Sequence, residues 1–149
     1  MIACTPASLL SWNFRLTGGG HAAEVTYNWL SEQGRIQAGP ETFQVIKQGM
    51  LSGTWTLQGP DGVRAKAVKS TPLTRTFEIE TSSGPVTLRA ESLMGRTMVL
   101  LGSGYGCRIA PAHWFTRRAT IEGDFRDFPS LCFAFWLTSL LWRRNAQSS

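Results

Sequence analysis

Acidic residues are scarce in this sequence. Its 149 residues include 10 Asp and Glu against 15 Lys and Arg, which gives a formal net charge of +5. Such an excess of positive charge favours anionic partners without specifying one. Histidine is rarer still: His21 and His113 lie far apart, and neither belongs to an HExxH motif. A metal site needs several convergent ligands, so we expect neither a metal nor another cofactor.

Paired cysteines are also missing. Cys4, Cys107 and Cys132 form no CxxC motif, and their odd number leaves at least one thiol outside any disulfide. The first residues, Met-Ile-Ala-Cys-Thr-Pro, contain neither a basic segment nor the apolar stretch of a secretory signal. We therefore expect a protein of the reducing cytoplasm.

No motif in the sequence indicates catalysis. The glycine-rich segment from Gly102 to Gly106 follows neither the GxGxxG nor the GxSxG pattern, and we interpret it as a tight turn between strands. Cys107 and His113, on adjoining predicted strands, could approach each other as a cysteine nucleophile and its base would, but no family motif accompanies them. We predict a non-enzymatic protein without catalytic residues.

Hydrophobic residues are plentiful in comparison. They make up 42% of the chain, against 17% for charged residues, which describes a packed globular protein. A chain of this length fits one domain, which we expect to span residues 1–149. The 15 glycines and 7 prolines recur at short intervals, and turn residues spaced in this way indicate short elements.

Alternation of apolar and polar residues predicts strands over most of the chain. The segments 51–57 and 63–68 flank a Gly-Pro-Asp-Gly turn and form a predicted hairpin, with Leu51 and Val63 among the residues expected to face the core. Other candidate strands are 12–16, 25–30, 42–47, 77–80, 86–91, 98–101, 107–109 and 119–121. About ten to twelve short strands, confined to roughly residues 11–122, indicate a mostly β sandwich or barrel.

One segment departs from the strand pattern. From Leu131 to Trp142 the chain is apolar on every face of a helix, apart from two adjacent hydroxyl residues. Asp127 and Pro129 suit the start of such a helix, and the cations of Arg143 and Arg144 suit its C-terminal dipole.

Length decides whether this helix belongs in a bilayer or in a protein core. A helix over about residues 129–143 spans roughly 23 Å, less than the roughly 30 Å hydrocarbon layer, so we expect no transmembrane span. A closed antiparallel β-barrel of about 10–12 strands would enclose the helix and leave no strand edge exposed. A short membrane tail, anchored by Trp136, Trp142 and the two terminal arginines, is the alternative.

Several of these features are shared with a known superfamily. They are the short strands from Glu24 to Ile121, the segments Ala65-Lys-Ala-Val-Lys-Ser and Pro111-Ala-His-Trp-Phe-Thr-Arg-Arg-Ala-Thr-Ile121, and the terminal apolar helix. In them, roughly the last five-sixths of the chain resembles the tubby C-terminal-like superfamily, which includes LURP-one-related proteins and phospholipid scramblases. Small bacterial proteins with the same Phe-Thr-Arg-Arg and Leu-Leu-Trp-Arg-Arg endings are similar too. The resemblance implies a barrel of about twelve strands threaded by a C-terminal helix, and binding of phospholipid head groups by basic residues.

Basic residues are concentrated between Arg64 and Arg118. The candidate ligand-binding residues within this stretch are Lys66, Lys69, Arg75, Arg117 and Arg118. Guanidinium groups bind phosphate oxygens bidentately, which makes the Arg117-Arg118 pair the main surface candidate, although only one of two neighbours in a strand points outward. A solvated barrel exterior, or a salt bridge to Glu122 or Asp124, would explain the same residues without a ligand.

These observations leave three functional hypotheses. The first is a cytoplasmic barrel, peripheral to the membrane, that binds anionic phospholipid or another phosphorylated ligand through a basic face. The second is a structural or protein-interaction module with no small-molecule ligand. Nucleic-acid binding is the weakest, because the aromatic residues that it would use cannot be separated in the sequence from core Trp and Phe.

Overall fold

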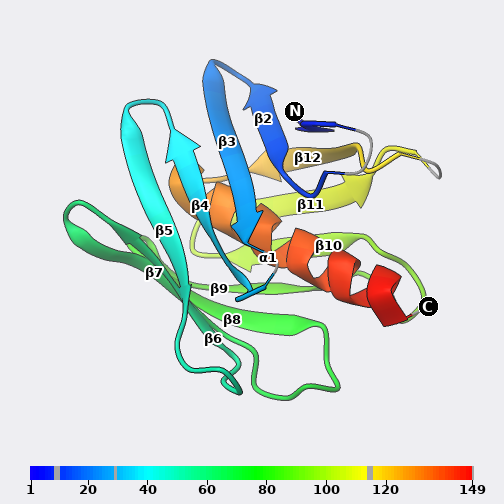
Figure 1. Ribbon diagram of the computed structural model, residues 1–149. Coiled ribbons are helices and arrows are strands. Elements are labelled where there is room, and N and C mark those ends of the chain that lie inside the picture. The colour runs from blue at the N-terminus through cyan, green and yellow to red at the C-terminus, as the bar shows by residue number, and fades with distance from the viewer. Residues whose placement is uncertain (9–10, 29, 114–115, 149) are drawn as a thin grey trace.

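In a computed structural model, which describes residues 1–8, 11–28, 30–113 and 116–148, twelve antiparallel strands close into a barrel around a C-terminal helix (Figure 1). This confirms the predicted fold class. The strands are β1 (Ile2–Pro6), β2 (Phe14–Gly18), β3 (His21–Asn28), β4 (Gln33–Ala38), β5 (Glu41–Lys47), β6 (Thr54–Gly59), β7 (Gly62–Val68), β8 (Thr76–Thr81), β9 (Gly84–Ala90), β10 (Met98–Gly102), β11 (Tyr105–Pro111) and β12 (Ala119–Asp124), and the helix is α1 (Phe128–Ser148).

Each strand pairs with its neighbours in sequence, and β1 closes the barrel by pairing with β12 through the partners Ile2 and Ile121. Connections therefore alternate between two ends of the barrel. At one end, which we call the turn end, short glycine-containing turns join β2 to β3, β4 to β5, β6 to β7, β8 to β9 and β10 to β11. At the other, the loop end, lie the connections β1–β2, β3–β4, β5–β6, β7–β8, β9–β10 and β11–β12.

Two strands were not expected from the sequence. β1 lies before residue 11, where the predicted strands begin, and its apolar alternation is limited to Ile2 and Cys4. β4 fills a stretch for which no strand was predicted, because its inward positions include Gly34, which contributes no apolar side chain. The predicted strand 25–30 agrees with β3 as far as Asn28, and it also includes Trp29, which lies outside the described residues.

The predicted hairpin 51–57 and 63–68 forms, but two inward assignments were wrong. Leu51 is fully exposed in the β5–β6 connection, because β6 begins only at Thr54. Val63 is also exposed, because a bulge shifts the β6–β7 register. In β6, Leu57 pairs with Ala65, but the residue after Leu57 pairs with Val63. The residue of β7 between Val63 and Ala65 therefore has no partner in β6.

The helix begins where the sequence predicted and continues further. The Asp127 carboxylate accepts hydrogen bonds from the Ser130 backbone N–H (3.1 Å) and hydroxyl (2.6 Å), which makes Asp127 the N-cap. Residues 128–143 are all buried, in agreement with the predicted central helix over 129–143. The helix does not end at Arg143 but continues to Ser148 beyond the barrel. Within the described part of the chain, no helix combines the length and apolarity that crossing a bilayer requires.

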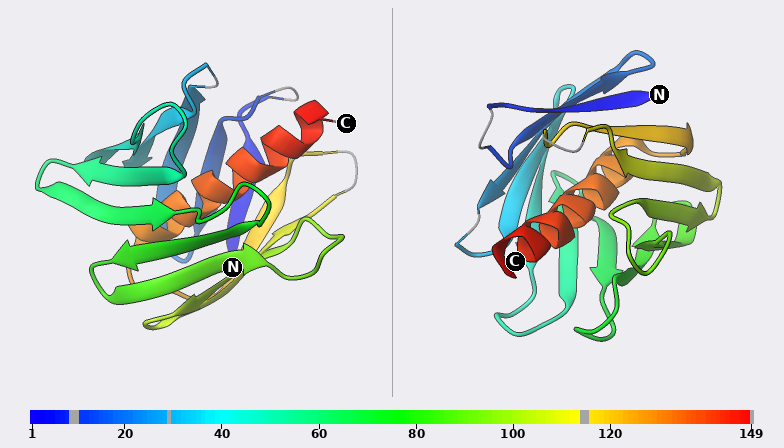
Figure 2. Two further views of the ribbon diagram at one scale, coloured as in Figure 1. Left: turned by 90° about the horizontal axis from the view of Figure 1, so that it is seen from below. Right: turned by 90° about the vertical axis from the view of Figure 1, so that its right-hand side faces the viewer.

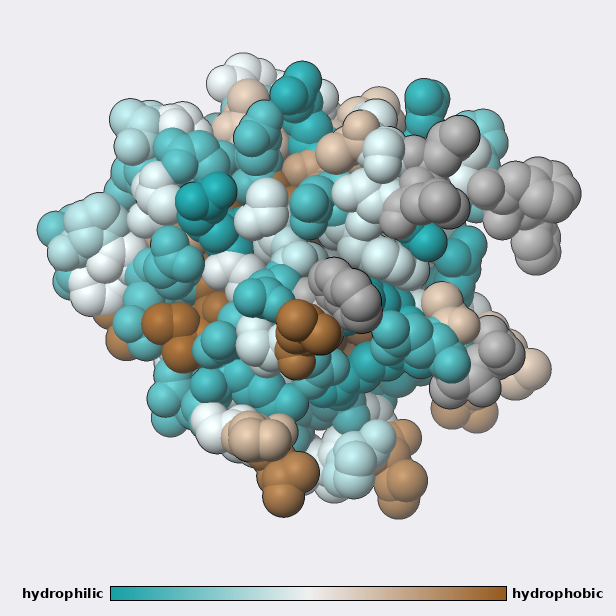
Figure 3. Space-filling view, in the orientation of Figure 1, coloured by the Kyte–Doolittle hydropathy of each residue, from teal (hydrophilic) through white to brown (hydrophobic). Residues whose placement is uncertain are grey.

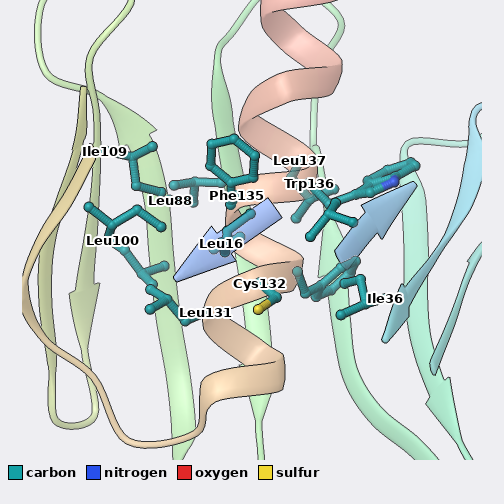
Figure 4. Packing of buried hydrophobic residues seen from close by; sticks show 14 of the residues in the cluster. Leu16, Ile36, Leu88, Leu100, Ile109, Leu131, Cys132, Phe135, Trp136 and Leu137 are labelled. Atoms are coloured by element: carbon teal, nitrogen blue, oxygen red, sulfur yellow. The ribbon is translucent and has the colours of Figure 1, made fainter. Parts of the chain in front are cut away.

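Strands surround the helix (Figure 2), and the aliphatic side chains of the barrel pack against it from several directions (Figure 4). The Trp136 indole lies against Gly34 of β4 and donates a hydrogen bond to the Thr26 carbonyl (3.1 Å). The hydroxyls of Thr138 and Ser139 bond to carbonyls of the preceding helical turn, so these two polar residues are satisfied inside the core. The terminal apolar segment is therefore the centre of the hydrophobic core.

Candidate functional site: the basic loop end

The two ends of the barrel carry opposite excesses of charge. At the loop end lie the basic residues Lys47, Lys69, Arg75, Arg96, Arg117, Arg118, Arg143 and Arg144, against the acidic residues Glu32 and Glu91. At the turn end the acidic residues Glu41, Asp61, Asp124 and Asp127 outnumber the basic residues Arg64 and Arg126. The barrel is thus polarised along its axis, and the end at which α1 finishes is the positive one.

A cleft of about 390 Å³ opens at the loop end, between the β5–β6 and β7–β8 connections and the last turns of α1. We call it the basic cleft, because Lys47, Lys69 and Arg144 line it. The Trp55 ring also contributes to the lining, with the Lys47 ammonium and the Arg144 guanidinium 5.4 and 5.6 Å from its centroid. Three separate segments, β5, the β7–β8 connection and α1, thus bring their cations to one place.

One carboxylate, that of Glu32 in the β3–β4 connection, neutralises part of this charge. Arg144 donates to both of its oxygens, with Nε to Oε2 at 2.7 Å and Nη2 to Oε1 at 2.6 Å, and Lys47 Nζ lies 2.7 Å from Oε1. The hydrogen bonds from Arg144, followed by that from Lys47, lower the pKa of Glu32 to about 2. The Glu32 carbonyl accepts a further hydrogen bond (3.0 Å) from the indole of Trp55, a residue that lines the cleft.

Lys69 is the cation of the cleft that lacks a counter-charge. Its ammonium donates to the Thr71 carbonyl (2.6 Å), and no carboxylate pairs with it in the part of the chain that the structure describes. Partial burial, and secondarily the nearby Arg144, lower the pKa of the Lys69 ammonium. A partly desolvated cation beside a second cation is a site that an anion such as a phosphate group would stabilise.

Two of the predicted ligand-binding residues have structural contacts at the loop end. Arg75 donates to the carbonyls of Ser92, Leu93 and Gly95, and so holds the β9–β10 connection against the start of β8. Arg117 stacks over the Trp12 ring at 4.2 Å, and it also donates to the Ser11 carbonyl (3.0 Å). The Arg117 contacts are not the ion pair to Glu122 or Asp124 that the sequence offered as an alternative for Arg117 and Arg118.

The other predicted residues have more accessible side chains. Arg118 is exposed at the start of β12, and Lys69 lies in the basic cleft. Lys66 is exposed on the outer wall of β7, where it pairs in register with Glu80, away from the loop end. The structure therefore brings four of the five predicted residues to one end of the barrel. They do not form one cluster there, because β7 and β12 lie at different positions around the barrel.

Three residues at the cleft were not predicted as site residues from the sequence: Lys47, Glu32 and Arg144. Lys47 ends the predicted strand 42–47, and the structure shows that its ammonium pairs there with Glu32. For Arg144 the sequence indicates an interaction with the helix C-terminal dipole or a membrane anchor, and not the ion pair with Glu32. Two arginines directly after an apolar helix were the available signal, because a helix that crosses a barrel must present them at one end.

The cysteine and histidine considered for nucleophilic chemistry do not meet. Cys107 points into the core, where burial raises the pKa of its thiol to about 11 and where Sγ contacts the Asp124 carbonyl (2.7 Å). His113 is exposed in the β11–β12 connection, which follows the far end of β11 from Cys107. Trp114 and Phe115, which were part of the segment that resembles the tubby-like proteins, lie outside the described residues. Among the described residues, no three His, Cys, Asp or Glu side chains are grouped so that they could hold a metal ion.

No family model, curated protein or solved structure matches this chain.

Proposed function

We propose that this protein is a non-enzymatic barrel, peripheral to the membrane, whose loop end binds anionic phospholipid or another phosphorylated ligand. The observation that carries the proposal is Lys69, a partly buried ammonium that lies in a cleft beside Arg144 without a carboxylate partner in the described chain. A phosphate oxygen would supply the missing counter-charge and displace little else.

The wider charge distribution supports the same ligand class. The exposed side chains of Arg96 and Arg118 add positive charge at the same end of the barrel as the cleft, while the acidic excess lies at the opposite end. Near an anionic membrane each such cation contributes about 1 kcal/mol, and the polarity of the barrel would orient it before contact. The resemblance to the tubby-like proteins implies the same class of ligand.

Vesicle flotation tests the proposal. The protein is expected to float with phosphatidylcholine vesicles that contain phosphatidylserine, to float poorly with phosphatidylcholine alone, and to be released by salt. Lys69→Glu should weaken this binding, whereas Lys66→Glu, which changes the same charge on the outer wall, should weaken it less. Equal flotation with both kinds of vesicle, or equal effects of the two substitutions, would contradict the proposal, and no flotation would favour the protein-interaction alternative.

A further inference from the structure

In the part of the chain that the structure describes, the most exposed large apolar side chains are all at the loop end. Among the described residues, the large hydrophobic side chains that are at least 86% exposed are Leu30, Met50, Leu51, Leu73, Leu93 and Met94. They belong to four different connections, β3–β4, β5–β6, β7–β8 and β9–β10. In Figure 3 isolated hydrophobic side chains protrude from the lower margin of the molecule, where the connections next to β6 and β8 lie in Figure 1.

This placement is not explained by the fold. Single exposed leucines are ordinary in proteins, but four successive connections at one end each carry such a residue at their surface. The barrel core is complete without them, because it is filled by the strands and by α1. At the turn end the exposed large apolar residues among those described are Met1, at 72%, Val63, at 62%, and Leu101, at 41%.

We infer that these loop tips insert into the interfacial layer of an anionic bilayer, so that the barrel stands on the membrane by its loop end. The inference rests on the proposed function and extends it, because it names the bilayer as the source of the phosphate and gives the orientation of the protein. The tips enter the boundary between head groups and acyl chains, while the surrounding cations remain at the level of the phosphates.

The pattern of the side chains fits a bilayer better than a protein partner. A protein interface has a contiguous packed apolar centre and a polar rim. Here the apolar residues stand on separate loops, with the basic residues of the same end around and between them. A fluid bilayer accepts such scattered insertions, because lipid molecules fill the space between the tips, and the mixture of leucines with cations matches its apolar interior and anionic surface.

The basic cleft and the loop tips also adjoin each other. Met50 and Leu51 line the cleft together with Lys69 and Arg144, and Leu73 follows the lining residues of the β7–β8 connection. One lipid could therefore place its phosphate between Lys69 and Arg144 while its acyl chains pass beside Met50 and Leu51. The cleft and the tips would then act on the same molecule.

Substitution of the tips tests the inference. The double substitution Leu51→Ser and Leu93→Ser removes apolar groups that make no core contact, so the protein should remain folded while its affinity for phosphatidylserine-containing vesicles falls about tenfold for each leucine. Val63→Ser, an exposed apolar residue near the turn end, is the matched control and should leave the affinity unchanged. Equal affinities of the double variant and the wild type would overturn the inference.

A depth measurement distinguishes failure of this inference from failure of the proposed function. Because all three native cysteines are buried, a polarity-sensitive fluorophore can be attached selectively to Leu51→Cys or, at the turn end, to Ser82→Cys. With phosphatidylserine vesicles, lipids brominated in their acyl chains should quench the label at position 51 and not that at 82. Binding that depends on Lys69, with neither label quenched, would overturn insertion and leave the proposed function standing. No vesicle binding would overturn insertion together with phospholipid as the ligand in the proposed function.

Discussion

Arg144 and Glu32 join the last turns of the helix to the rim of the barrel. The guanidinium donates to both carboxylate oxygens, at 2.6 and 2.7 Å, although the two residues are 112 positions apart in the sequence. The same carboxylate also forms an ion pair with the Lys47 ammonium, so one acidic side chain links β5 and α1 to the β3–β4 connection. Lys69, on the β7–β8 connection, has no acidic partner among the described residues, which makes the cleft attractive to an anion.

Glu32→Gln should lower the free energy of unfolding by about 2 kcal/mol at pH 7, because Arg144 and Lys47 would lose their shared counter-charge. The pKa of Glu32 is lowered, so its contribution is complete above about pH 5 and is lost as the pH falls toward the folded-state pKa of about 2. Urea unfolding of both proteins over this range should therefore show their difference narrowing on acidification. A difference that stayed constant would contradict the assignment.

Glu24→Gln is the matched control for that experiment. Glu24 also pairs with an arginine, Arg15, at 3.0 Å, but both side chains are more than half exposed. Exposed pairs of this kind contribute little, so the free energy of unfolding should change by less than about 0.5 kcal/mol.

Gly34→Ala should destabilise the barrel by about 2–4 kcal/mol, because the added methyl group would meet the Thr26 carbonyl oxygen and the Trp136 indole nitrogen. Thermal or urea unfolding measures the effect. Gly106→Ala is the matched control, since it places the same methyl group in open space on another strand. Similar losses for the two variants would show that Gly34 is not required by the helix.

The three thiols should be unreactive in the native protein. Cys4, Cys107 and Cys132 are buried, and burial raises the pKa of each thiol, so little thiolate is present or accessible at pH 8. Ellman's reagent should therefore label none of them rapidly until denaturant is added, and then all three. Rapid modification of one thiol in the native protein would contradict the burial of that residue.

Deletion of residues 131–149 should unfold the barrel, because it removes the buried aromatic and aliphatic side chains at the centre of the core, each of which contributes roughly 1.5–3 kcal/mol or more. Deletion of residues 145–149, which follow the buried part of the helix, should leave the fold intact. Circular dichroism and gel filtration distinguish the two results. A folded protein without residues 131–149 would instead support a membrane tail.

The sequence predicted the barrel, the buried helix and its start because these depend on local patterns. Period-two alternation is visible wherever inward positions are apolar, as at Phe77 and Ile79, and a segment that is apolar on all faces has no other place than a core or a bilayer. β4 was not predicted, because one of its inward positions is Gly34 and shows no apolar side chain in the sequence. Trp136, which is distant in sequence, occupies the space that an inward side chain there would have filled. Only the tertiary structure could reveal that the Trp136 ring fills this space.

The basic cleft was only partly predictable for a similar reason. Lys69 was identified from the local excess of basic residues, but Lys47, Glu32 and Arg144 come together only when the barrel closes. The six exposed apolar residues are spread over four connections and show no periodicity in the sequence. Their common location follows from the alternation of connections between the two ends, which the sequence pattern does not specify.

Residue-resolved NMR during titration with anionic bilayer nanodiscs tests the central claim most directly, namely that the loop end meets a phospholipid surface. With nanodiscs that contain phosphatidylserine, signals should broaden or shift in the connections 48–53, 69–75 and 91–97 and at the end of α1, while those of the turn end, including 39–40 and 60–62, remain unchanged. With nanodiscs of phosphatidylcholine alone the changes should be much weaker. Changes centred on the turn end or spread evenly over the barrel wall would contradict the account.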